Sequence, residues 1–212
     1  MYPHRIRLRG PWECEPIDGS LPPRRVTMPS GWIAAGLAGF RGSARFTRRF
    51  GYPGQIDDGE HVWLLGENAR GCRSVSLNGR LLSDSPDDAF AFDVTPILSQ
   101  RNLLEMIVQG DSDDAGLWGD IVLEIRRDAY LFDVAARCSD NGVIVSGNVV
   151  GAAPQPLELY TLIDNRHADY RTIMPSAAGE PFQIELMEAG QTVRVELICV
   201  SSIWYAVEVL VT

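Results

Sequence analysis

The sequence predicts an all-β protein built from two consecutive β-sandwiches. Short apolar runs alternate with polar residues at a period of two, and turn-forming residues separate them. Helix signals are nearly absent: the one candidate is a single turn over residues 93–98, with Thr95 as its cap and Pro96 at its first position. Many short strands joined by turns are typical of a sandwich or a jelly roll.

In the front half, strands are predicted at 61–65, 74–77, 103–108 and 121–125. Asn78-Gly79 directly follows the second of these and predicts a type I′ hairpin turn, which requires a positive φ at both residues. An acidic loop at residues 110–114 separates the last two strands.

The residue composition changes after a short polar segment, Arg126-Arg127-Asp128. We therefore expect one domain over residues 1–127 and another over 128–212. The second half contains six predicted strands, at 130–136, 143–150, 157–163, 182–187, 192–200 and 203–211. In the fifth strand the alternate residues Val193, Val195, Leu197 and Cys199 share one face. Six or seven strands in about 85 residues favour an immunoglobulin-like sandwich.

The composition excludes some classes of protein. The 212 residues are 45% hydrophobic and carry a net charge of −9, which disfavours a nucleic-acid partner. No secretory h-region and no run of eighteen apolar residues is present, so we expect a cytoplasmic protein that does not cross a membrane. The four cysteines are far apart, and we expect reduced thiols that are buried or half-buried, with no bond between Cys138 and Cys199.

Six segments of the front half resemble, in order, the N-terminal sugar-binding domain of glycoside hydrolase family two, the beta-galactosidase, beta-glucuronidase and beta-mannosidase group. They are Leu8-Arg9-Gly10-Pro11-Trp12, which is similar to the family's first strand, then 28–32 (MPSGW), 39–50 (GFRGSARFTRRF), 75–79 (VSLNG), 90–104 (FAFDVTPIL followed by NLL) and 116–123 (GLWGDIVL). The resemblance implies a galactose-binding-like jelly roll followed by an immunoglobulin-like domain.

In that family a catalytic (β/α)₈ barrel comes next, and we expect this chain, which stops after the strand at 203–211, to lack it. The resemblance therefore implies a non-catalytic carbohydrate-associated module. It would bind carbohydrate weakly and would have a protein partner or a separate catalytic domain. Two alternatives stay open: a structural β-sandwich protein that only presents surfaces to partners, and a truncated glycosidase.

Four residues are candidate ligand contacts: Trp12, Trp32, Asn78 and Asp114. Trp12 and Trp32 are placed at strand ends and could stack on a sugar or pack in the core, whereas Trp63 is expected in the core and Trp118 is a further stacking candidate.

The resemblance implies a sugar contact for Asn78, which could equally serve the turn alone, and for the acidic loop around Asp114. That loop could also be solvated or hold a structural calcium ion. We expect no catalytic residue and no cofactor, because no pair of carboxylates has the spacing of a glycosidase site.

Overall fold

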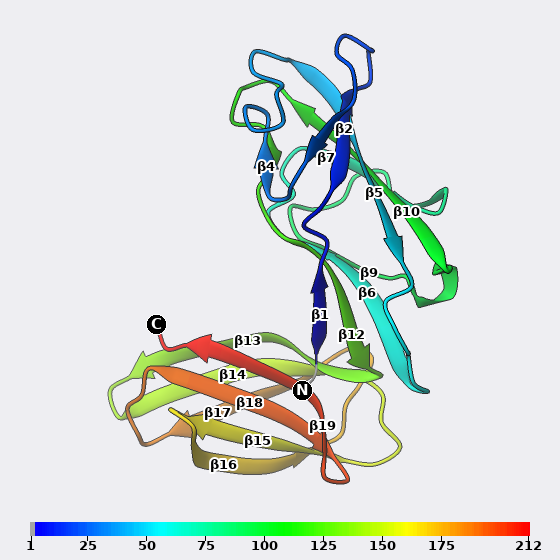
Figure 1. Cartoon of the computed structure of the whole chain (residues 1–212). Coiled ribbons are helices and arrows are strands. Elements are labelled where there is room, and N and C mark those ends of the chain that lie inside the picture. The colour runs from blue at the N-terminus through cyan, green and yellow to red at the C-terminus, as the bar shows by residue number, and fades with distance from the viewer. Residues whose placement is uncertain (1–2) are drawn as a thin grey trace. The chain divides into compact units, whose positions relative to one another are not determined.

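The computed structural model describes residues 3–212 and is all-β in that range: it contains strands, one short 3₁₀ turn and no α-helix (Figure 1). No helix in the described part of the chain could span a bilayer. The chain forms two compact units. We call Arg5–Ile56 with His61–Glu124 the first unit; the second unit comprises Ile125–Thr212, Asp57–Glu60 and the segment before Arg5. The predicted all-β class is confirmed.

The front part of the chain contains a six-stranded sheet with the strand order β3-β2-β5-β10-β7-β8. Its strands are β2 (Trp12–Pro16), β3 (Arg24–Val26), β5 (Gly42–Gly51), β7 (Cys72–Leu77), β8 (Arg80–Ser83) and β10 (Arg101–Gly110). The long central pair β5 and β10 is antiparallel and runs in unbroken register from Arg101 opposite Gly51 to Gly110 opposite Gly42. Every second residue of β10 is buried, as expected for a strand with one face on a core.

A four-stranded sheet, β1-β12-β6-β9, and a two-stranded ribbon, β11-β4, complete the front part. Their strands are β1 (His4–Arg7), β4 (Ser30–Gly31), β6 (Glu60–Gly66), β9 (Phe90–Asp93), β11 (Gly116–Leu117) and β12 (Ile121–Arg127). Residues 8–11 were expected to continue a strand into Trp12, but they link β1 to β2. Pro11 has no backbone N–H to donate, which prevents regular pairing there.

Two local predictions have different outcomes. The hairpin at Asn78-Gly79 is confirmed, with φ values of 53° and 76°. The helical turn is a 3₁₀ turn, Thr95–Ile97, with Val94 at its N-cap, so Thr95 is not the cap. The carboxylate of Asp93 instead accepts hydrogen bonds from the Thr95 amide (2.9 Å) and hydroxyl (2.6 Å), and it holds the turn from one residue earlier.

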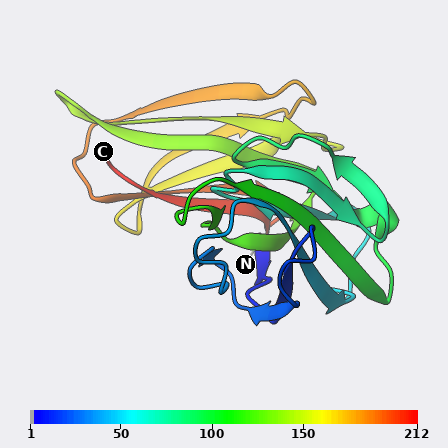
Figure 2. The same cartoon turned by 90° about the horizontal axis from the view of Figure 1, so that it is seen from above.

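The second unit contains two antiparallel sheets, β13-β14-β17 and β16-β15-β18-β19, whose long strands are seen from two directions in Figures 1 and 2. The strands are β13 (Ala129–Ser139), β14 (Gly142–Gly151), β15 (Leu157–Ile163), β16 (Arg166–Ile173), β17 (Glu180–Leu186), β18 (Thr192–Cys199) and β19 (Ser202–Leu210). Both sheets contribute to one apolar core. The predicted alternation of β18 is confirmed, since Val193, Val195, Leu197 and Cys199 are all buried.

In the second unit, the strand that the sequence did not reveal is β16. Its residues, RHADYRTI, are mostly polar and mostly exposed, and it lies at the edge of its sheet. A hairpin turn at Asp164 and Asn165, with φ values of 46° and 63°, folds it back on β15. An edge strand with few buried side chains carries almost no apolar alternation, which explains why the periodicity missed it.

The four cysteines are free, but Cys138 is exposed rather than buried or half-buried. Cys138 and Cys199 lie at opposite ends of β19, because the Cys138 amide donates to the Thr212 carbonyl whereas Cys199 pairs with Ser202. Ten residues of strand span roughly 33 Å, far beyond the reach of a disulfide.

We expect thiol reagents to modify Cys138 alone in the native protein. Burial raises the pKa of the Cys14 thiol to about 12 and that of Cys72 to about 11, so both lack thiolate as well as access. Titration with a chromogenic disulfide should give one fast thiol in native buffer and four in denaturant. A Cys138→Ser variant should lose the fast phase, and fast modification of two or more cysteines in the native protein would contradict this assignment.

Candidate functional site

Two of the four candidate ligand contacts, Trp12 and Trp32, lie in the core with exposed fractions of 0%. The Trp12 indole N–H donates to the Leu8 carbonyl. The Trp32 ring lies almost parallel to Phe46, with 6.0 Å between ring centroids and 15° between planes. Neither indole presents a face to solvent, so neither is placed to stack on a sugar. Both tryptophans therefore pack in the core, which is the alternative to sugar stacking that the sequence left open.

The side chain of Asn78 forms hydrogen bonds within the protein, around its own turn. Its side-chain N–H groups donate to the Ile97 carbonyl (2.8 Å) and the Asn102 amide oxygen (2.9 Å), and its amide oxygen accepts from the Leu103 backbone (2.9 Å). These bonds fasten the β7–β8 hairpin to the start of β10. Both side-chain donors are therefore occupied within the protein, and the turn alternative accounts for this residue.

The acidic loop is tied down through Asp113. Its carboxylate accepts hydrogen bonds from the Gly39 amide (2.8 Å) and the Arg41 guanidinium (3.0 Å). These contacts, the Gly39 amide first, lower the pKa of Asp113 below its usual range. Their stabilising effect is therefore present above the ordinary carboxyl pKa and is lost as the pH falls through the lowered value. No group of three or more His, Cys, Asp or Glu side chains within residues 3–212 is arranged to hold a metal ion.

Asp114, the fourth candidate, is exposed and lies beside an aromatic ring. Its backbone carbonyl accepts a hydrogen bond of 2.7 Å from the indole N–H of Trp118. Trp118 is 48% exposed. It is more exposed than Trp12 and Trp32, which are buried, and than Trp63, which is half-buried. Trp63 was expected in the core, but Val62 and Leu64 take the buried positions of β6, so its ring is on the other face.

Gly31 lies directly against the ring of Trp118. Gly116 of β11 pairs with Gly31 of β4. A Cβ atom on Gly31 would overlap the Trp118 ring, and a Cβ on Gly116, whose φ is +144°, would overlap the backbone of Ser30 and Gly31. The indole therefore lies against bare backbone on one side. Its remaining surface is exposed, and it is oriented by the bond to Asp114.

We call Trp118 and Asp114, with Gly31 against the ring, the indole platform. A rigid aromatic face suits the apolar face of a pyranose, and an adjacent carboxylate can accept hydrogen bonds from sugar hydroxyls. From the sequence, Asp114 was predicted as a ligand contact and Trp118 as a further stacking candidate. The sequence did not show that Gly31, which pairs with Gly116, would lie against that ring.

No family model and no curated protein matches the sequence. Similarity is found among solved structures. The FMN-binding beta-glucuronidase from Facaelibacterium prausnitzii L2-6 superposes with a TM-score of 0.77 at 18% identity, covering 98% of this chain and 39% of that one.

The beta-glucuronidase from Bifidobacterium dentium gives 0.73 at 19% identity, with 98% of this chain and 48% of that one covered. The beta-D-mannosidase from Dictyoglomus thermophilum gives 0.77 at 13%, with coverages of 98% and 36%.

This chain therefore spans less than half the length of each of these glycosidases. Identities this low show a shared fold and no more. One similar structure, from Bacteroides cellulosilyticus, is a family-two glycosyl hydrolase. Residues 3–212 thus have the fold of the β-sandwich domains of family-two glycosidases.

Proposed function

We propose that this chain is a non-catalytic, carbohydrate-associated module, with a galactose-binding-like jelly roll in front and an immunoglobulin-like sandwich behind. The observation that carries the proposal is the superposition of 97–99% of the chain on glycosidases that are two to three times as long. The described residues contain no α-helix, so no (β/α)₈ barrel lies among them. By analogy, the module acts beside a catalytic domain.

The buried acids give no sign of glycosidase chemistry. A retaining glycosidase needs two carboxyl groups about 5 Å apart, one of them protonated. Glu124 is fully buried but lies 2.7 Å from Arg5, and Glu60 lies 3.6 Å from Arg127. Each of these two buried glutamates is thus engaged in an ion pair with an arginine. These glutamates are structural in our proposal.

The indole platform is the proposed contact for sugar. One exposed ring face and a few hydroxyl contacts cannot enclose a small ligand as a deep pocket does. We expect dissociation constants near millimolar, which correspond to about −4 kcal/mol. Selectivity should therefore be modest for any single sugar and should improve for longer chains that make more contacts.

We expect Trp118→Ala to remove most of the neutral-glycan binding while the protein stays folded. Loss of the ring face should weaken binding by roughly tenfold, because a stacked aromatic contact contributes about 1–1.5 kcal/mol. Ligand-observed NMR against a panel of neutral oligosaccharides would measure this. Phe132→Ala, which also removes an exposed aromatic ring but from the second unit, is the matched control and should bind normally.

The same preparations should not hydrolyse nitrophenyl glycosides. Steady turnover that one Glu→Gln substitution abolishes would overturn the non-catalytic proposal. Unchanged binding by Trp118→Ala would remove the sugar site from the platform.

A protein-contact function is favoured by one further observation. Six large apolar side chains of the second unit are more than 45% exposed: Phe132, Tyr170, Met174, Met187, Val200 and Leu210. Two of these, Met187 and Val200, are about three-quarters exposed. Apolar side chains of this kind are the usual material of a protein interface. This second candidate would become the leading one if no glycan were bound.

A further inference from the structure

The face of the six-stranded sheet that is turned away from the core carries three arginines at one end. Arg25 pairs with Glu13, and Glu13 pairs with Thr47, so these three side chains share a face. Arg49 lies two residues after Thr47 on that same face. It pairs with Leu103, and Arg101 lies two residues before Leu103, again on the same face.

The opposite face of the same strands is the buried one. Trp12, Phe46 and Leu104, which lie at the alternate positions of β2, β5 and β10, have exposed fractions of 0%. Arg25, Arg49 and Arg101 are therefore held on the solvent side by the pleat of the sheet. Their position does not depend on a flexible loop.

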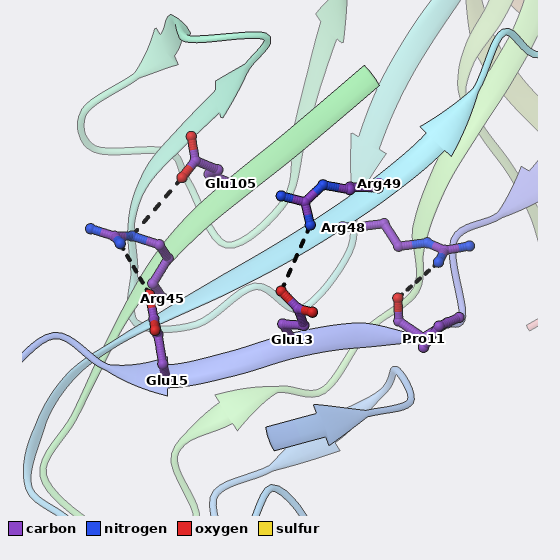
Figure 3. A network of polar contacts seen from close by, with 7 residues as sticks. All are labelled: Pro11, Glu13, Glu15, Arg45, Arg48, Arg49 and Glu105. Atoms are coloured by element: carbon purple, nitrogen blue, oxygen red, sulfur yellow. Dashed lines mark hydrogen bonds and ion pairs between the residues drawn. The ribbon is translucent and has the colours of Figure 1, made fainter. Parts of the chain in front are cut away.

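Charge is balanced at one end of this face and unbalanced at the other. Arg45 is neutralised by Glu15 at 3.1 Å and by Glu105 at 4.0 Å, as Figure 3 shows. Further along the strand, Arg49 has only a long contact with Glu13, at 3.9 Å, and both side chains are more than half exposed. An exposed pair of this kind is worth little and is easily exchanged for a ligand.

The neighbouring arginines have no acidic partner. Among residues 3–212, no carboxylate lies within ion-pair distance of Arg25 or Arg101. Arg48 reaches the Pro11 carbonyl at 2.8 Å (Figure 3), but its Nε is buried without a hydrogen-bond partner. Partial burial also lowers the pKa of Arg48. We call Arg25, Arg49 and Arg101, which share the solvent face of the sheet, the arginine strip.

Two adjoining hollows follow the strip. The larger, about 610 Å³, is lined by Arg49, Arg101, Gln100 and residues next to them in the chain. The smaller, about 210 Å³, is lined by residues that include Arg25, Arg48, Arg49 and Glu13. Arg49 lines both hollows, so the two lie next to each other on the sheet. Among the described residues, Glu13 is the only acidic one that lines either hollow, although the chain carries a net charge of −9.

This concentration of positive charge indicates the chemistry of a ligand. A guanidinium presents a planar fork of N–H donors that matches a carboxylate with two parallel hydrogen bonds. Arg49 and Arg101 are diagonal neighbours, about 7–8 Å apart at Cα, and Arg25 lies two strands from Arg49, roughly 10 Å across the sheet. Charges spread at this spacing over a shallow surface fit a chain with repeated carboxylates better than a single small anion.

We propose that the arginine strip binds an acidic oligosaccharide, one that carries carboxylate groups on successive sugar units. This inference rests on the proposed carbohydrate-associated function and names its ligand class. The carboxylates of the glycan pair with Arg49 and Arg101 in the larger hollow and with Arg25 in the smaller one. The site is separate from the indole platform, which needs no charge on its ligand.

The test uses the full chain and isothermal titration with an oligogalacturonate, compared with the same oligosaccharide fully methyl-esterified. We expect the acidic form to bind clearly more tightly than the neutral methyl ester, and we expect its binding to weaken as salt rises because the pairs are exposed. Arg49→Gln with Arg101→Gln should weaken binding roughly tenfold or more, at about three- to fivefold for each exposed pair. Arg137→Gln, which removes an exposed charge from the second unit, should leave it unchanged.

The outcomes separate the two proposals. Equal binding by the double variant, or equal binding of the methyl ester, would overturn the arginine strip as the site. Binding of neutral glycans alone, lost in Trp118→Ala, would leave the carbohydrate-associated function standing and reject the acidic ligand. Absence of binding to every glycan tested would reject both. Circular dichroism spectra of all variants should match the wild type, because the substituted arginines lie on the solvent side of the sheet.

Discussion

Replacing Trp32 by alanine is expected to destabilise the first unit by about 3–5 kcal/mol. The Trp32 ring is completely buried and stacks on Phe46. Its centroid also lies 6.2 Å from that of the Phe40 ring. Removing a large buried aromatic side chain forfeits its transfer free energy and leaves a cavity that the core only partly closes. Urea denaturation followed by far-UV circular dichroism measures the loss, and hydrogen exchange should assign it to residues 5–124.

Trp118→Ala is the matched control for this substitution. The same atoms are removed, but from a ring that is 48% exposed, so we expect a change of about 1 kcal/mol or less. The two variants should thus separate stability from binding: Trp32→Ala unfolds more easily, whereas Trp118→Ala binds neutral glycans less well. A Trp32→Ala protein that kept wild-type stability and lost only glycan binding would return Trp32 to the site.

Replacing Gly151 by alanine is expected to destabilise the second unit by at least about 3 kcal/mol. Gly151 ends β14 with a φ of +114°, where side chains are strained by about 1–3 kcal/mol. A Cβ atom there would also overlap the Asp128 carbonyl and the Ala129 Cα, which are backbone atoms and cannot rotate away. The pairing of Ala129 with Gly151 would have to separate, together with the hydrogen bond from the Ala152 amide to Asp128.

Gly54→Ala provides the control for backbone strain alone. Its φ is +117°, nearly the same as that of Gly151, but nothing lies within 4 Å of an added Cβ atom. We expect a loss of about 1–3 kcal/mol for this variant, and a clearly larger loss for Gly151→Ala. Equal losses in the two would mean that the overlap with Asp128 relaxes at no cost. Hydrogen exchange should confine the effect of Gly151→Ala to residues 125–212.

Most strands could be predicted from the sequence because each buries one face. The alternation of Val193, Val195 and Leu197 defined β18 directly, since a period of two is the signature of a half-buried strand. The hairpin at Asn78-Gly79 was equally accessible, because few residue pairs adopt a positive φ at both positions. Strand β16 was not, because an exposed edge strand takes its register from β15 and not from its own apolar pattern.

The candidate site likewise has features that the local sequence decides and features that only the tertiary structure decides. The sequence determined by itself an all-β fold, the turn at Asn78 and the exposed acidic loop that contains Asp114, because local propensity and polarity decide these. Only the tertiary structure decided which tryptophan is open. Trp32 and Trp118 each lie next to glycine in the sequence, but Trp32 packs against Phe46, and Trp118 lies against Gly31 of a distant strand. It also brought Arg25, Arg49 and Arg101 to one face, through pairings of residues far apart in the chain. Exposure and charge clustering depend on such long-range pairings, which no local pattern encodes.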